Sequence, residues 1–213
     1  MEREKFVINI GRQLGSGGKP IGEIIARRLG VKLYDKELIN LAARESGLCA
    51  ECFEQADERS RKGVLATLVG YLRAPFTGYE GGNSNNILAN ESLFRIQSDV
   101  IREIASRESA IFVGRCADYI LREHPRCVNV FITADEEDRC ARLCERLHCT
   151  EEEARALMER TDEQRASYYN YYSSRTWGEA ATYHLCVNSS TLGDEGTADF
   201  ILDFAARKLH EQF

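Results

Sequence analysis

The sequence lacks several features that would place a protein outside the class of globular cytoplasmic domains. Its 213 residues contain no apolar run approaching the length that crosses a bilayer. Residues 1–5 are largely charged and lead directly into a short apolar run, so a signal-peptide core is absent there. Basic residues are not in excess, because the net charge is −6, and this disfavours non-specific nucleic-acid binding. We therefore expect a cytoplasmic protein whose partners are neither membranes nor nucleic acids, although the acidic total is compatible with a local basic cleft for phosphates.

A second C-x-x-C pair, which a four-cysteine zinc site would need, is also missing. Among the eight cysteines only Cys49 and Cys52 have this spacing. Cys140 and Cys144 lie four residues apart within an apolar helical pattern, which is typical of small buried side chains. Disulfides are not expected in a reducing cytoplasm. The cysteine pattern therefore disfavours both a zinc site and a disulfide framework.

What the sequence does contain is an alternation of short apolar runs and helical patterns. Hydrophobic residues make up 43% of the chain and charged residues 29%, a globular balance. Such alternation predicts an α/β fold in which a parallel sheet carries helices on both faces. Thr150 and Glu153 predict a capping box at the start of one helix, and residues 74–86 are rich in turn formers. The predicted strands are 6–10, 31–34, 110–114, 128–132 and 184–188, and helices are expected near 20–29, 35–46, 65–72, 93–104 and 135–147, from Thr150 onward, and from Gly196 onward.

Polar residues follow most of these strands directly. In a parallel α/β sheet, the carboxyl ends of the strands meet at one edge, and ligands bind there. This topology would bring together four segments that lie far apart in the sequence. They are Gly11–Lys19, Asp35, Gly114–Asp118 and Asn188–Ser190.

The segment GRQLGSGGKP, residues 11–20, is the main functional signal. A glycine-rich loop between a strand and a helix can turn its backbone N–H groups toward an anion, and the helix adds its positive end. Lys19 is placed to reach the outer phosphates of a nucleotide. The spacing departs from the G-x4-G-K-S/T pattern, since Gln13 and Pro20 replace the first glycine and the hydroxyl residue, so a plain turn is the alternative interpretation. The residues predicted to hold phosphate are Gly15, Ser16, Gly17, Gly18 and Lys19, with the Ser16 hydroxyl as a substitute for the missing one.

Several motifs in order resemble the cytidylate kinase-like family of P-loop nucleoside-monophosphate kinases. They are GSGGK, YDKELI, VGRCADYIL, the R-x4-R spacing before YYNYY, Trp177-Gly178 and VNSS. The resemblance implies one P-loop NTPase-type domain over residues 1–213, with three layers and a five-stranded parallel sheet. It also implies a helical acceptor-binding insert at approximately 49–97 and a lid at approximately 145–178. The implied activity is ATP-dependent phosphoryl transfer, with Mg²⁺, to a nucleoside monophosphate, and CMP or dCMP is the first expectation.

Carried onto this chain, the resemblance assigns roles to single residues. Gly15 to Lys19 would hold the ATP phosphates, while Asp35, Lys36, Arg115 and Asp118 would face the phosphorylated acceptor. Arginine suits this task because its planar group grips phosphate oxygens in pairs. The catalytic set would be Lys19, Arg115 and two lid arginines, Arg160 and Arg165, with Arg139 on the ATP side and Mg²⁺ held through Asp35 or Asp118.

The same motifs also depart from the family pattern. Lys36 stands where cytidylate kinases have a serine, Leu41 where they have an arginine, and Val113 where they have an aspartate. These differences at the acceptor side keep open a small-molecule kinase with another acceptor. Together with Pro20, Val113 also keeps open a nucleotide- or anion-binding regulatory module without catalysis. For Arg139 the plain alternative is a solvated helix face, and for Asp35 it is a helix cap.

Overall fold

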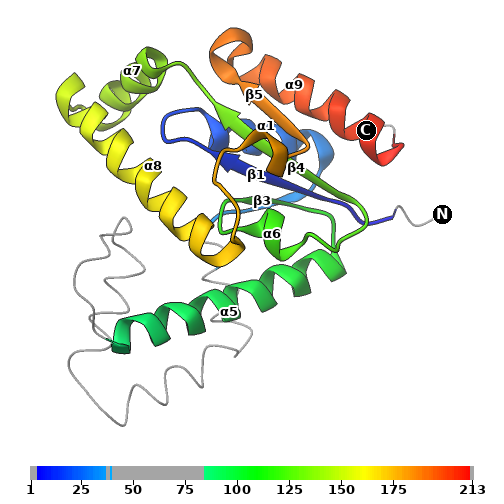
Figure 1. Ribbon diagram of the computed structural model, residues 1–213. Coiled ribbons are helices and arrows are strands. Elements are labelled where there is room, and N and C mark those ends of the chain that lie inside the picture. Colours follow the sequence, from blue (N-terminus) through cyan, green and yellow to red (C-terminus); the bar gives the residue numbers. More distant parts are fainter. Residues whose placement is uncertain (1–3, 37–38, 40–83, 212–213) are drawn as a thin grey trace.

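The computed structural model describes residues 4–36, 39 and 84–211, and within them five strands form one parallel sheet (Figure 1). The order across the sheet is β2-β3-β1-β4-β5. Each strand lies close to a run predicted from the sequence, and the α/β fold with a five-stranded parallel sheet is confirmed. The strands are β1 (Val7–Arg12), β2 (Lys32–Tyr34), β3 (Ala110–Val113), β4 (Cys127–Thr133) and β5 (Leu185–Asn188).

Helices cover both faces of this sheet. Helices α1 and α9 pack together against one face, and α5 and α6 lie on the other (Figure 1). Helices α7 and α8 pack against each other beyond the carboxyl ends of the strands. No helix among the described residues is long and apolar enough to cross a membrane. The helices are α1 (Gly18–Leu29), α5 (Ser84–Arg107), α6 (Ala117–Ile120), α7 (Glu136–Leu147), α8 (Glu151–Ser173) and α9 (Ser189–Leu209), with a short 3₁₀ helix, η1 (Ala180–Thr182).

The alternation of side chains along β1 and β3 creates the two layers of core. Ile8 and Ile10 are buried with Ile111 on the face covered by α1 and α9. Val7 and Phe112 are buried with the residues of α5 and α6 on the opposite face. Because both faces are covered, the strands are apolar at consecutive positions, as expected for a parallel sheet.

Two helix boundaries differ from the sequence expectation. Helix α5 already begins at Ser84, inside the segment predicted to be turn-rich. Helix α9 begins at Ser189 rather than Gly196, because the Asn188 side chain caps it by accepting the backbone N–H of Ser190. A kink at Gly193, where φ is 65°, divides α9. The helices predicted near 35–46 and 65–72, most of the insert and the Cys49–Cys52 pair lie outside the described residues, so the domain boundaries stay a prediction.

Candidate functional site

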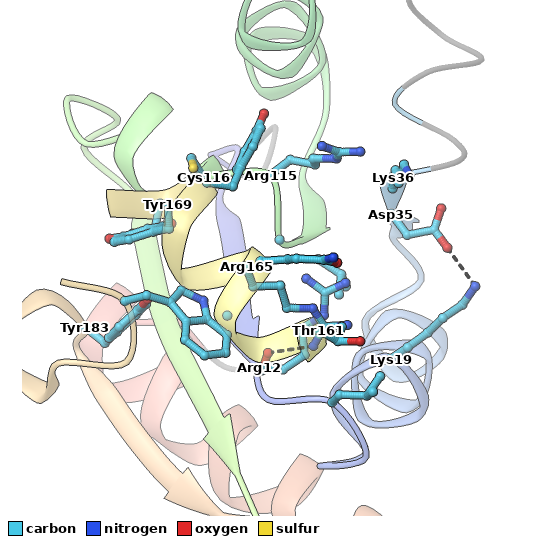
Figure 2. A pocket seen from close by; sticks show the side chains of 18 of the residues that line it. Arg12, Lys19, Asp35, Lys36, Arg115, Cys116, Thr161, Arg165, Tyr169 and Tyr183 are labelled. Carbon is cyan, nitrogen blue, oxygen red and sulfur yellow. Dashed lines mark hydrogen bonds and ion pairs between the residues drawn. The ribbon is translucent and has the colours of Figure 1, made fainter. Parts of the chain in front are cut away.

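A cavity of about 510 Å³ opens at the carboxyl ends of β1 and β3. The sheet and the turn after β3 form one wall, and one side of α8 forms another. Figure 2 shows Lys19 and Asp35 at one side of the cavity and Tyr169 and Tyr183 at the other. The lining is strongly basic for an acidic chain: its basic residues are Arg12, Lys19, Lys36, Arg115 and Arg165, and its acidic residues are Asp35 and Asp118.

The glycine loop that joins β1 to α1 contains two left-handed glycines and a side-chain hydrogen bond within the loop. Gly15 and Gly17 have φ values of 81° and 77°, a left-handed conformation that glycine adopts at little cost. The Ser16 hydroxyl donates to the Gln13 carbonyl at 2.9 Å, and Ser16 is fully buried. The structure therefore places the Ser16 side chain inside the loop, and it gives no support to the expected role of that hydroxyl as a substitute metal ligand.

Lys19 and Asp35 form an ion pair at the mouth of the cavity. Lys19 Nζ lies 2.7 Å from Asp35 Oδ2. The Lys19 side chain is 56% exposed, whereas that of Asp35 is 9% exposed. The Asp35 carboxylate thus pairs with the glycine-loop lysine across the sheet edge. The Asp35 carbonyl also accepts the Ile39 backbone N–H at 2.9 Å, as at the start of a helix, so the helix-cap alternative stays open. Pro20 follows in the first turn of α1, where its missing N–H removes no helical hydrogen bond.

Arg115 sits in a strained turn after β3. Gly114, Arg115 and Cys116 have φ values of 80°, 59° and 55°, and the last two residues have a Cβ that disfavours this region. The Arg115 guanidinium lies over the ring of Tyr168 from α8, 5.4 Å from its centroid. The turn therefore directs Arg115 into the cavity and against the helix that closes it.

Asp118 occupies the aromatic side of the cavity and is 7% exposed. The Tyr169 hydroxyl donates to Asp118 Oδ2 at 2.6 Å. Burial raises the pKa of Asp118, and the Tyr169 hydrogen bond opposes this shift in part. Burial also raises the pKa of the neighbouring Cys116 thiol, which keeps it protonated at neutral pH.

One face of α8 lines the cavity, and this face separates the two predicted lid arginines. Arg165 lies on it together with Leu157, Thr161 and Tyr168, at helical spacing. Arg160 is exposed and is not part of the lining given by the described residues. Two residues five positions apart point about 140° apart around a helix axis, so one orientation of α8 cannot turn both toward the cavity.

Arg139, expected on the ATP side, is instead buried between α7, α8 and the glycine loop. Its Nε donates to the Leu14 carbonyl at 2.7 Å, and its Nη2 forms a short ion pair with Asp162. Asp162 Oδ1 accepts the Leu14 backbone N–H at 2.8 Å. Arg139 is 8% exposed and lies outside the described cavity lining, so the solvated-face alternative also fails. In this structure Arg139 and Asp162 support the glycine loop from outside the cavity.

Sequence reasoning missed Arg12, which ends β1 and lines the cavity. Its backbone carbonyl accepts Arg165 Nη1 at 3.0 Å. The signal was present, because Arg12 directly follows the buried part of β1 at the ligand-binding edge. The glycines and the lysine of residues 11–20 predict a phosphate-binding loop, and that pattern assigns no role to Arg12.

The two predicted metal-facing carboxylates fit Mg²⁺ unequally. Asp35 lies beside the glycine loop and offers the oxygen ligands that Mg²⁺ prefers, directly or through water. Asp118 is engaged by Tyr169 on the aromatic side. Within residues 4–36, 39 and 84–211, no group of three or more His, Cys, Asp or Glu side chains forms a metal cluster. The donor set thus fits an ion that arrives with nucleotide phosphates and is held by Asp35.

Comparisons with known proteins agree with the motifs and the fold. The model of the cytidylate kinase-like family matches residues 7–191. An uncharacterized protein from Eubacterium ventriosum ATCC 27560 is 25% identical, with a TM-score of 0.69 and coverage of 94% of this chain and 98% of that one. No curated protein gave a match.

Two solved kinases share the fold at lower identity. A gluconokinase from Sinorhizobium meliloti 1021 is 15% identical, with a TM-score of 0.55 and coverage of 98% of this chain and 96% of that one. Shikimate kinase from Bacteroides thetaiotaomicron is also 15% identical, with a TM-score of 0.52 and coverage of 96% and 98%. At this level of identity the likeness concerns the fold.

Proposed function

The chain belongs to the cytidylate kinase-like family, and on that premise we propose that it transfers a phosphoryl group from ATP to a small phosphorylated acceptor. Nucleoside monophosphates are the first acceptor class to consider, with CMP and dCMP ahead of the others. The observation that carries the proposal is the composition of the cavity: five basic and two acidic side chains line it in a chain of net charge −6.

Phosphoryl transfer depends mainly on positioning and on neutralising charge, and the cavity residues match those needs. The glycine loop and Lys19 would bind the ATP phosphates, since the loop leads into the start of α1 and a helix start attracts anions. Lys19 lines the described cavity, whereas Gly15, Ser16, Gly17 and Gly18 lie outside its lining. Arg115 would grip the acceptor phosphate from the turn after β3. Arg165 would close on the transferring group from α8, because it lies in the cavity between those two regions (Figure 2).

Asp35 is the residue that would hold Mg²⁺, and Lys36 and Asp118 would contact the acceptor. When bound, Mg²⁺ neutralises phosphate charge and fixes the orientation of the phosphate chain. The ion pair with Lys19 holds the Asp35 carboxylate near the glycine loop. Arg160 could join the site only after α8 rotates, so it is the weakest member of the catalytic set.

Another small-molecule acceptor on the same fold is the second candidate. Lys36, rather than a serine, lines the acceptor side, and it adds a positive charge where a neutral hydroxyl was expected. That charge favours an acceptor with more negative charge than a nucleoside monophosphate carries. A non-catalytic nucleotide-binding module is the third, and Pro20 in place of the hydroxyl residue is the observation that favours it.

The test is ADP release from ATP and Mg²⁺, with CMP, dCMP, UMP, AMP, GMP and a set of non-nucleotide phosphate compounds as acceptors, and with an acceptor-free control. We expect acceptor-dependent turnover in the wild type and a loss of at least about a hundredfold in Lys19→Ala. Turnover with a non-nucleotide phosphate only would establish the second candidate. ATP binding that requires Lys19 but yields no turnover with any acceptor would contradict the kinase proposal and leave the regulatory module.

A further inference from the structure

The Arg12 side chain packs against two glycines, at positions where any larger residue would clash with it. A Cβ on Gly18, at the start of α1, would lie 2.6 Å from Arg12 Cβ and 2.7 Å from Arg12 Cγ. A Cβ on Gly114, in the turn after β3, would lie 2.0 Å from Arg12 Nη1. The stem of Arg12 therefore passes along the first residue of α1, and its guanidinium reaches the turn that carries Arg115.

This path connects the two turns that would bind phosphates, of which the one at Gly114 lines the cavity and the one at Gly18 lies beside it. Gly18 belongs to the loop expected to hold the ATP phosphates, and Gly114 precedes the arginine expected to hold the acceptor phosphate. Figure 2 shows Arg12 near Arg165 in the middle of the cavity, away from both ends.

The position of Arg12 is fixed by its backbone as well as by its side chain. Arg12 is paired with Ile132 of β4 in the sheet, at the last position of the β1–β4 ladder. Its carbonyl accepts a hydrogen bond from Arg165 Nη1 at 3.0 Å, so the two cavity arginines are positioned relative to each other. An arginine at the end of a central strand moves less than one on a loop, and fixed charges are what transition-state stabilisation requires.

Lys19 occupies a different place from Arg12. Its side chain is 56% exposed and its ammonium is engaged by Asp35 at the mouth of the cavity. Lysine is also a point charge, whereas the arginine fork can bind two phosphate oxygens at once. Arg12 is therefore a half-buried cation at the end of a central strand, whereas Lys19 is exposed at the mouth of the cavity.

We propose that Arg12 is a catalytic residue that binds the phosphoryl group during its transfer and contacts phosphates of both substrates. This role rests on the proposed kinase function. The terminal phosphorus of ATP forms a bond to an oxygen of the acceptor's phosphate while its bond to the bridging oxygen of ADP breaks. The acceptor phosphate dianion has no proton to lose, and Arg12 keeps all of its protons, so it acts by binding charge alone.

The test compares Arg12→Met and Arg12→Lys with Arg207→Met as a matched control. Arg207 is on α9, and its side chain is 78% exposed. Arg12→Met should lower kcat by roughly a thousandfold, as loss of a phosphate-binding arginine does in other phosphoryl transferases. Arg12→Lys keeps the stem and one charge but loses the fork, so kcat should still fall by at least about thirtyfold. Arg207→Met should turn over like the wild type.

Calorimetric titration with ATP separates this inference from the kinase proposal. We expect Arg12→Met to weaken ATP binding by about tenfold or more, with an unchanged unfolding midpoint as the check on folding. Arg12-dependent ATP binding without turnover in the wild type would defeat the kinase proposal and retain Arg12 as a phosphate ligand. Wild-type kcat and ATP affinity in Arg12→Lys, or in a folded Arg12→Met, would overturn the inference while the kinase function stands.

Discussion

Asp118 is a buried carboxyl in the cavity lining, and its burial makes the stability of the protein depend on pH. Burial raises the pKa of its carboxyl above the ordinary value of 3.8. The folded protein therefore binds this proton more tightly than the unfolded chain. Stability from this group is fully present below the unfolded pKa and is lost as the pH rises through the folded pKa. The ionised form of this buried carboxyl is therefore a cost to the fold, and that cost grows as the pH rises above the unfolded pKa.

We predict that Asp118→Asn is at least as stable as the wild type at neutral pH, and that its advantage shrinks toward about pH 4. An asparagine oxygen can still accept the Tyr169 hydroxyl, and no charge is buried. Urea unfolding of both proteins from about pH 4 to about pH 8 would measure this. Tyr169→Phe is the control, because it removes the donor and should cost about 1–3 kcal/mol.

The same variant bears on the role of Asp118 in the site. If its carboxylate contacts the acceptor, Asp118→Asn should lose turnover while it keeps its stability. A loss of more than about 1 kcal/mol at neutral pH would contradict this prediction, since it would mean that the carboxylate is held by charge, with Arg175 as one source of that charge.

Single residues could be placed from the sequence where a strand end or a helix start fixes them. Lys19, Asp35, Arg115 and Asp118 share one cavity because each follows a parallel strand or begins the next helix at the same sheet edge. On a long helix this reasoning fails, because the sequence does not say how the helix is rotated. Arg160 and Arg139 lie outside the described cavity lining, and the sequence does not predict this because it does not fix the rotation of their helices.

Helix α7 reaches the glycine loop through Arg139, and α8 contacts the same loop as well as lining the cavity. Asp162 of α8 accepts the Leu14 N–H at 2.8 Å and pairs with Arg139 of α7. Arg165 Nη1 lies 3.7 Å from the same carboxylate. Asp162 thus joins the glycine loop to both helices, and its side chain is 16% exposed.

We predict that Asp162→Ala lowers the free energy of unfolding by about 3 kcal/mol or more, because it leaves Arg139 buried without its partner. Asp203→Ala on α9 is the matched control, as it breaks an exposed pair with Arg207 and should cost less than about 1 kcal/mol. Urea unfolding at fixed pH measures both. Equal losses in the two variants would show that the Asp162 contacts are no stronger than a surface ion pair.

At the scale of elements, the ends of helices could be predicted only where a local hydrogen bond decides them. The capping box is present as expected: Glu153 N–H donates to Thr150 Oγ1 at 3.3 Å, and Thr150 N–H donates to Glu153 Oε2 at 2.9 Å. Helix α9 begins earlier than Gly196 because the Asn188 cap starts a first turn upstream, and the main part of the helix follows the kink at Gly193. A glycine inside a helix breaks the periodic pattern without ending the helix.

The cavity is lined by segments that range from Gly11 to Tyr183, so it exists only in the folded protein. A ligand of the cavity should therefore raise the free energy of unfolding. The unfolded chain cannot reproduce this gathering of basic groups, so ATP, the ligand we propose for the cavity, should bind the folded protein alone. At about a hundred times its Kd, such a ligand adds about 2.7 kcal/mol to the free energy of unfolding. For a chain of this size we predict that ATP raises the midpoint of thermal unfolding by roughly 5–10 °C.

Adenosine at the same concentration separates the phosphate contribution from that of the base. Because the cavity is basic, adenosine should shift the midpoint by much less than ATP, and Lys19→Ala should lose most of the ATP shift. The ATP shift should also shrink at about 1 M salt, where charges are screened over roughly 3 Å. Equal shifts for ATP and adenosine would mean that the phosphates lie outside the cavity. The positive charge of this site would then serve the fold rather than the nucleotide.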